Sequence, residues 1–268
     1  DLDTPLVGTC QTLEKKYLRL TSQPIPSTVR PLNILRKTLK LLIDKYLEGA
    51  SYNYLCDQFK SMRQDLTVQH IKNEFTVSVY QYHCKLAIQF EDLGEFNQCQ
   101  SQLRLLYEGS SSPLRLEFYS YRILYYIITN NLEEAFDLKL QLIDEGVDLE
   151  SNIFLRTSFR LVESVLLNDY FQFFSLIKEF RFLNSIIMKE RIKSLAIICR
   201  SYKKIVLGFI KENLLFDHED DLLKFLRDHE LEQFVLQESV AFFDCSKSRF
   251  IVEALREKIY KKIDIKGQ

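Results

Sequence analysis

Apolar residues recur every three or four positions over most of the chain, up to about residue 200. In residues 32–46 this spacing places four leucines and a tyrosine on one face of a helix. Ser112 followed by Pro113 is typical of a helix start, because serine caps a helix and proline fits its first turn. The pattern therefore predicts successive amphipathic helices. The same spacing occurs in residues 52–62, 75–90, 96–106 and 192–202.

Short breaks with similar sequences separate these predicted helices. Their apolar anchors Phe96, Leu132 and Tyr170 lie 36 and 38 residues apart. A period of this size is typical of helix–turn–helix repeats, in which each pair of helices buries its apolar face against its neighbours. We therefore predict a mainly α fold built as a helical-repeat (TPR-like) superhelix.

The pattern changes after about residue 202. An apolar run at residues 205–207 leads into a brief helix, and Asp217 can cap a second helix. Residues 234–237 and 240–243 are apolar and flank a polar pair, which predicts a small hairpin.

A final basic helix follows, from about residue 250 to 263. Two helices and a hairpin within a short stretch form the layout of a winged helix. We therefore predict a helical-repeat superhelix over residues 1–202, followed by a winged helix with a C-terminal helix over residues 203–268.

Composition limits the classes of protein to consider. The chain has 268 residues, of which 46% are hydrophobic, and a formal net charge of −1 excludes a uniformly basic nucleic-acid binder. Glycine (7) and proline (5) are too scarce for a large all-β fold, which needs frequent turns. The sequence has no apolar run of membrane-spanning length and no signal-peptide pattern, so we expect no membrane partner. The first residue is Asp, which indicates a fragment of a longer protein.

Motifs for catalysis or metal binding are missing from the sequence. The six cysteines are scattered without a C-x-x-C pair, which indicates reduced thiols and no zinc site. The acidic run Asp217–Asp221 contains a histidine, but acids at a helix start need no metal. The chain also has no phosphate-binding loop, nucleophile elbow or paired metalloprotease histidines. We therefore predict no enzyme, no cofactor and no metal.

Basic and acidic residues alternate in blocks along the C-terminal third. Residues 178–211 hold 9 basic and 2 acidic residues, residues 213–244 hold 2 and 9, and residues 245–268 hold 7 and 3. The two basic blocks flank the predicted winged helix, which favours contact with nucleic-acid phosphates; a solvated helix face is the alternative. The candidate recognition helix at 220–230 is acidic, which argues against base reading in a groove. The candidate nucleic-acid contacts are Arg200, Lys203, Lys204, Lys211, Lys247, Arg249, Arg256, Lys258, Lys261 and Lys262.

Four phenylalanines of this region are candidates for a partner interface: Phe234, Phe242, Phe243 and Phe250. Strand alternation places Phe243 on the opposite face from Phe234 and Phe242. For Phe243 both the core and a partner interface are open, and for the other three the core is favoured.

Several strings resemble the Sac/GANP branch of the PCI superfamily, whose members combine a helical superhelix with a winged helix. They are Val7–Cys10, Lys16–Thr21, Ser27–Leu32, Ser61–Gln69 and Glu95–Gln100. The resemblance is specific over residues 6–107 and extends to the general plan beyond them. Within Ser61–Gln69 we expect Arg63 and Asp65 to tie neighbouring helices together through buried polar contacts.

The resemblance implies a nuclear, non-enzymatic scaffold in transcription-coupled mRNA maturation. It also implies two partners: a second, signalosome-twelve-like PCI protein bound through the winged helix, and a small acidic Sem/DSS protein. We favour that second PCI protein as the one that holds the acidic protein. Two alternatives stay open. The sequence also fits a PCI subunit of a proteasome-lid, signalosome or translation-initiation assembly without nucleic acid, and it fits a free-standing helical-repeat adaptor for peptides.

Overall fold

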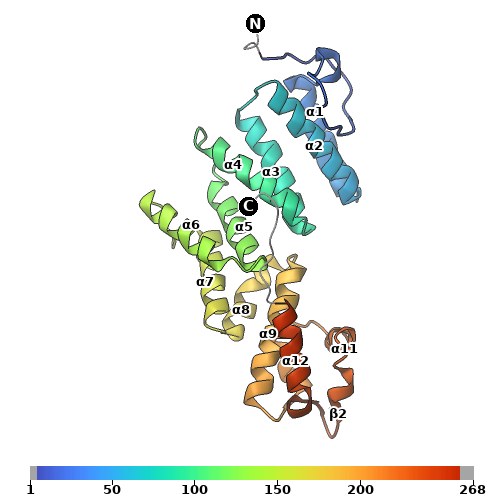
Figure 1. Ribbon diagram of the computed structural model, residues 1–268, viewed down its shortest axis with the longest axis vertical. Coiled ribbons are helices and arrows are strands. Elements are labelled where there is room, and N and C mark those ends of the chain that lie inside the picture. The colour runs from blue at the N-terminus through green and yellow to red at the C-terminus, as the bar shows by residue number, and fades with distance from the viewer. Residues whose placement is uncertain (1–4, 260–268) are drawn as a thin grey trace. The chain divides into compact units, whose positions relative to one another are not determined.

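The computed structural model describes residues 5–259, and these residues form a mainly helical fold with one small sheet, as the sequence predicts (Figure 1). The chain divides into two compact units, of which the first ends at Phe118 and the second begins at Tyr119. The domain boundary predicted after residue 202 lies inside the second unit.

The first unit is built from helices α1 to α4 and the first residues of α5. Leu35, Leu55 and Met62 are fully buried in a core between α1, α2 and α3. Polar side chains start the helices, because a side-chain oxygen can accept a hydrogen bond from a free backbone N–H of the first turn. Ser51 caps α2 and Asn73 caps α3 in this way. The elements are a 3-10 helix (Pro26–Thr28), α1 (Leu32–Leu47), α2 (Tyr52–Val68), α3 (Glu74–Gln89), α4 (Leu93–Tyr107) and α5 (Arg115–Ile128).

An irregular segment, residues 6–25, precedes these elements and lies against α1 and α2 (Figure 1). We call it the N-terminal strap. Its Gly8 lies so close to the backbone of Val29 that a Cβ at position 8 would collide with the Val29 carbonyl oxygen. The Gly8 N–H donates to Oε1 of Gln69 at 2.9 Å. Only glycine fits this contact, which fastens the strap to the end of α2.

The predicted helical repeat has a regular turn. Glu91, Asn130 and Asn168, spaced by 39 and 38 residues, adopt the left-handed conformation with φ of 57°, 57° and 56°. Each is followed directly by an Asp or Asn at the start of α4, α6 or α8. This conformation reverses the chain within one residue and leaves the next residue free to act as the cap. The apolar anchors of the predicted repeat lie at or near these helix starts.

The second unit is organised around α9, in which Ile192, Leu195 and Cys199 are fully buried. Helix α12 lies beside α9 (Figure 1). After α5 the unit contains α6 (Leu132–Asp144), α7 (Ile153–Leu166), α8 (Tyr170–Leu176), a 3-10 turn (Ile177–Phe180), α9 (Asn184–Ser201), β1 (Lys204–Val206), α10 (Leu207–Asn213), α11 (Glu219–Asp228), a 3-10 turn (Glu232–Phe234), β2 (Val235–Gln237), β3 (Ala241–Asp244) and α12 (Cys245–Ile259). Across the part of the chain that is described, every helix is too short or too polar to cross a bilayer.

Candidate nucleic-acid and partner interface

The C-terminal module, residues 204–259, contains a three-stranded antiparallel sheet in the order β1-β3-β2. The central strand β3 pairs Phe243 with Ile205 of β1 and with Val235 of β2. The predicted layout of two helices and a hairpin is present. The strand β1 was not predicted, because three residues are too few to show alternation; its only signal is the apolar run at residues 205–207.

Phe243 lies in the core of the module. Its side chain is fully buried, and Phe234 packs edge-on against it with ring centroids 6.5 Å apart. The structure therefore places Phe243 in the core, which is one of the two alternatives that the sequence left open. A place at a partner interface is wrong for this residue, since its own chain covers it.

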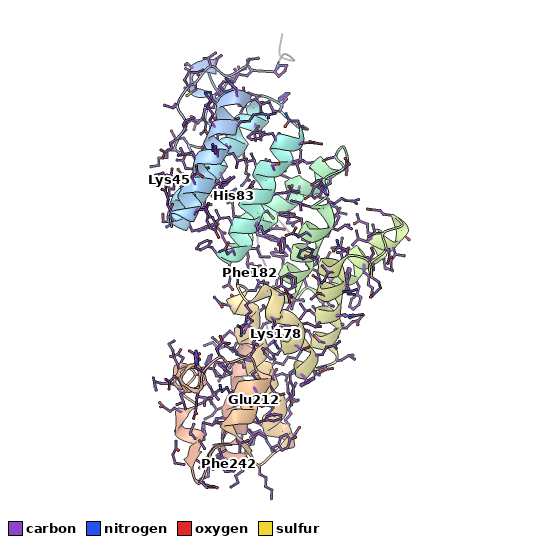
Figure 2. All side chains as sticks on the ribbon, turned by 180° about the vertical axis from the view of Figure 1, so that it is seen from behind. Lys45, His83, Lys178, Phe182, Glu212 and Phe242 are labelled. Carbon is purple, nitrogen blue, oxygen red and sulfur yellow. The ribbon has the colours of Figure 1, made fainter. Side chains whose placement is uncertain are left out.

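Phe242 points to the other face of the sheet, as alternation predicts, and is half-buried beside the hairpin (Figure 2). The Nζ atom of Lys204 lies 4.3 Å from the centroid of its ring. The same ammonium group is 3.0 Å from a carboxylate oxygen of Glu238 in the hairpin turn. Lys204 is thus held over the aromatic ring by a cation–π contact and an ion pair.

Phe250 is 83% exposed, so its expected place in the core is wrong. The reason is the position of α12, which begins at Cys245 rather than at about residue 250. Position 250 belongs to α12, whose buried side chains are Cys245, Ser248 and Val252, and a helix turns position 250 away from that side.

One face of α12 is exposed along the helix. Lys247, Phe250, Ile251, Ala254 and Lys258 follow the three- and four-residue steps of a single helical face, and all five are exposed. We call these residues the outer face of α12. At 1.5 Å per residue its two lysines stand about 16 Å apart. The face combines an apolar centre with a positive charge at each end.

Lys203 joins this face at one end. The backbone N–H of Ser246 donates to the carbonyl oxygen of Lys203 at 3.1 Å, which brings the start of β1 to the start of α12. Lys203, Lys247 and Lys258 are exposed, and within residues 5–259 none of them forms an ion pair. These three ammonium groups are available for an anionic ligand.

Other predicted contacts have partners inside the module. Glu253 pairs with Arg200 at 2.6 Å and with Arg256 at 3.4 Å. The Nε of Arg249 donates to the carbonyl oxygen of Cys199 at 3.0 Å, in the last turn of α9. Arg200 and Arg249 connect α9 and α12, and Arg256 pairs within α12, so the charges of Arg200 and Arg256 are partly neutralised within the fold.

Lys211 is half-buried on α10 and lines a shallow depression together with Val206 and Ala241. Lys261 and Lys262 lie outside the described residues.

Three of the nine basic residues in the block at residues 178–211 are buried or half-buried and bind backbone carbonyls, which the sequence did not predict. Lys189 of α9 donates to the carbonyl oxygen of Ile127 at 2.6 Å, and Lys193 donates to that of Val165 at 2.6 Å. Arg191 donates at 2.8 Å to a carbonyl directly after α10. Each cation therefore binds a carbonyl oxygen at the end of another helix, where the helix dipole favours positive charge. Burial lowers the pKa of Lys189 to about 8.

Within Ser61–Gln69, Arg63 and Asp65 have a structural role in the first unit, as predicted. Arg63 forms an ion pair with Glu95 of α4 and donates to Nδ1 of His83 at 3.0 Å. Asp65 accepts hydrogen bonds from the Nε of Arg30 at 2.7 Å and from its backbone N–H at 3.2 Å. The expectation that these two residues tie neighbouring segments together is confirmed.

Among the described residues, one group of potential metal ligands lies together in the first unit: His83, Glu95 and Cys99, with ligand atoms within 4.8 Å of one another. His83 stacks on Phe59 at 5.3 Å inside the helical layer (Figure 2). Arg63 already contacts both the imidazole and the carboxylate of this group. Burial raises the pKa of the Cys99 thiol to about 12, so this sulfur carries a proton at neutral pH. The group is an internal polar network centred on a guanidinium.

The fold and the module define a helical-repeat protein with a C-terminal helix–helix–hairpin element. Comparison with known proteins identifies its family: the profile of the SAC3/GANP family matches residues 10–234, and the chain belongs to that family.

Its relatives include two yeast proteins. The chain is 40% identical to the protein THP3 of Saccharomyces cerevisiae over 98% of its own length and 60% of that protein. It is 36% identical to the THP3 homolog of Schizosaccharomyces pombe over 98% of its own length and 67% of that homolog.

A third relative, the leukocyte receptor cluster member 8 homolog of Xenopus laevis, is 36% identical over 82% of the chain and 28% of the relative. The strings in the sequence indicate the Thp and leukocyte-receptor-cluster members within the branch, and these relatives confirm that assignment. The chain spans less than two thirds of the first relative's length.

Proposed function

We propose that this chain is a non-enzymatic scaffold subunit of a nuclear complex in transcription-coupled mRNA maturation. Membership of the SAC3/GANP family supports this class of function over a proteasome-lid, signalosome or translation-initiation assembly. We assign the C-terminal module to the winged-helix type that ends a PCI domain, on the strength of its helix–helix–hairpin layout.

The observation that carries the proposal is the outer face of α12 with Lys203 beside it. Phe250 and Ile251 form an apolar centre that a second PCI protein covers. Lys203, Lys247 and Lys258 stand at its ends and contact phosphates of RNA or DNA. Such contacts are independent of sequence and weaken with salt, because each one releases condensed counterions.

The small acidic Sem/DSS protein is assigned to the second PCI protein rather than to this chain. The support is that Lys189, Arg191 and Lys193 bind carbonyls at helix ends, which removes three of the nine basic residues that an acidic peptide could use. Cross-links found mainly between the acidic protein and residues 178–211 would overturn this assignment.

The proposed contact with nucleic acid is tested by changing Lys203, Lys247 and Lys258 to Glu in the co-expressed complex. RNA affinity is measured over a series of salt concentrations. We expect a loss of at least tenfold and a salt slope smaller by about two, since each phosphate contact on a single strand contributes about 0.7 to the slope.

The matched control changes three exposed lysines of the first unit, Lys16, Lys37 and Lys40, to Glu, which alters the net charge equally. Unchanged RNA affinity of the α12 variant in an intact complex would support the alternative scaffold without nucleic acid. An equal loss in the control variant would show that only net charge matters.

The proposed partner interface is tested with Phe250→Ser, which removes an exposed ring without opening the core. We expect the variant chain to fold but to lose the second PCI protein in co-purification. Phe171→Ser on α8 is the control, because Phe171 is 70% exposed and lies away from α12 in the sequence. Retention of the partner by Phe250→Ser would contradict the proposed interface.

A further inference from the structure

Helix α6 carries an apolar stripe that nothing in its own unit covers. Phe136, Leu140 and Ile143 are 39%, 61% and 51% exposed. Their spacing of four and three residues places them on one face across two helical turns. The opposite face, with Ala135, Leu138 and Leu142, is buried in the second unit. A soluble helix normally presents polar residues on its outer side, so this stripe requires an explanation.

Strong negative charge accompanies the stripe. Residues 133–150 contain 7 acidic residues and a single basic one, Lys139. Asp137 and Asp144 follow the same helical steps as the stripe and form a ridge along one flank of it. Both are exposed, and within residues 5–259 neither carboxylate has an ion pair.

Lys139, the one cation of residues 133–150, contacts α7 rather than the acidic flank. The Nζ of Lys139 lies 3.6 Å from a carboxylate oxygen of Glu163 and 5.4 Å from the ring centroid of Phe159, both on α7. The acidic flank of the stripe therefore keeps its full negative charge.

We propose that this face of α6 docks a basic amphipathic helix of a partner protein. The stripe offers three anchor positions across two turns, which is the footprint of a helix lying along a groove or ridge. The acidic flank selects lysine and arginine beside the partner's apolar residues. This surface is separate from the outer face of α12 and does not depend on the function proposed for that face.

The charge of the flank excludes the other common occupants of an apolar helix face. Nucleic-acid phosphates and anionic lipid headgroups are repelled by the carboxylates. A second copy of α6 would bring two acidic ridges together, which disfavours a symmetric dimer at this face.

The experiment uses the whole chain in its co-expressed complex and a labelled synthetic helix of 18 residues. The probe carries leucines at helical positions i, i+3, i+4 and i+7, with lysines along both flanks. A second probe has glutamate at every lysine position. We expect the basic probe to bind at least tenfold more tightly than the acidic probe, as measured by fluorescence anisotropy.

Two variants locate the binding on α6. Leu140→Ser and the double change Asp137→Lys with Asp144→Lys should each weaken the basic probe by at least tenfold. Leu105→Ser is the matched control for the stripe, because Leu105 on α4 is also 61% exposed. Exposed Glu212 and Asp220, each changed to Lys, form the control for charge. Circular dichroism confirms that each variant is folded.

Failure of both probes to bind would overturn the proposal, as would equal binding of the two probes. An equal loss in the Leu105→Ser control would also overturn it, because that result would mean non-specific adhesion to exposed leucines.

Discussion

The buried pair between Arg30 and Asp65 gives a direct test of how the N-terminal strap is held. Arg30 and Asp65 are both fully buried, and Asp65 also forms an ion pair with Lys15 of the strap. Arg30 donates in addition to the carbonyl oxygen of Leu13 in the strap at 2.7 Å. Asp65→Asn keeps the size of the side chain and removes its charge, so the guanidinium is left buried without a counter-charge.

The expected cost follows from this burial. Removing one partner of a buried ion pair costs about 3–5 kcal/mol, because the remaining charge stays out of water without compensation. Ion pairs on a protein surface contribute only about 0–1 kcal/mol, because water screens the two charges. Since a domain is stable by about 5–15 kcal/mol, Asp65→Asn should leave the first unit marginal.

Urea unfolding measured by far-UV circular dichroism suits this chain, which has no tryptophan. Trypsin digestion provides a local readout, because Lys15, Lys16 and Arg19 of the strap become cleavable when the strap detaches. Changing Asp65 to Leu and Arg30 to Met together should recover part of the loss, since both charges leave the core. The reasoning would be refuted if Asp65→Asn lowered the free energy of unfolding no more than Asp217→Asn, which breaks the exposed pair with Arg181.

Three further predictions concern other contacts. Gly8→Ala should release the strap to trypsin without unfolding the helices, since its Cβ would collide with the Val29 carbonyl; an intact strap would contradict this. Lys189 has its pKa lowered by burial from 10.5 to about 8, so the unfolded state binds more protons between these values and stability rises with pH there. Between pH 8 and pH 10.5 the free energy of unfolding in urea should rise by about 3 kcal/mol more for the wild-type chain than for Lys189→Met. The same pH dependence in both proteins would refute this prediction. Phe243→Ala should cost about 3–5 kcal/mol in the same assay by opening a cavity in the module, and a cost below about 1 kcal/mol would place Phe243 outside the core.

The helical repeat could be predicted because apolar periodicity records which face of each helix is buried. The hairpin could also be predicted from the sequence, since two apolar runs flank a polar pair. The left-handed turn residues Glu91, Asn130 and Asn168 carried no reliable signal, because Glu rarely adopts that conformation and Asn adopts it only in some contexts.

The candidate site was predicted less completely. Charge counting treats every lysine as a surface group, whereas Lys189 and Lys193 are buried and donate to helix ends that are distant in sequence. The available signal was their position four residues apart, which places them on the same side of the helix as each other. Phe250 was misplaced because the final helix was predicted to begin at about residue 250, whereas α12 begins at Cys245 and turns position 250 away from its buried side. Which lysines stay unpaired depends on contacts between α9 and α12, and no pattern within one segment contains that information.

The central claim is that Lys203, Lys247 and Lys258, at the ends of the outer face of α12, contact nucleic acid in the assembled complex. Ultraviolet cross-linking of RNA to the purified complex, followed by mass spectrometry of the cross-linked peptides, tests it most directly. We expect cross-links within residues 203–206 and 245–258, and their loss when Lys203, Lys247 and Lys258 are changed to Glu. Cross-links confined to the first unit or to the partner protein would contradict the claim.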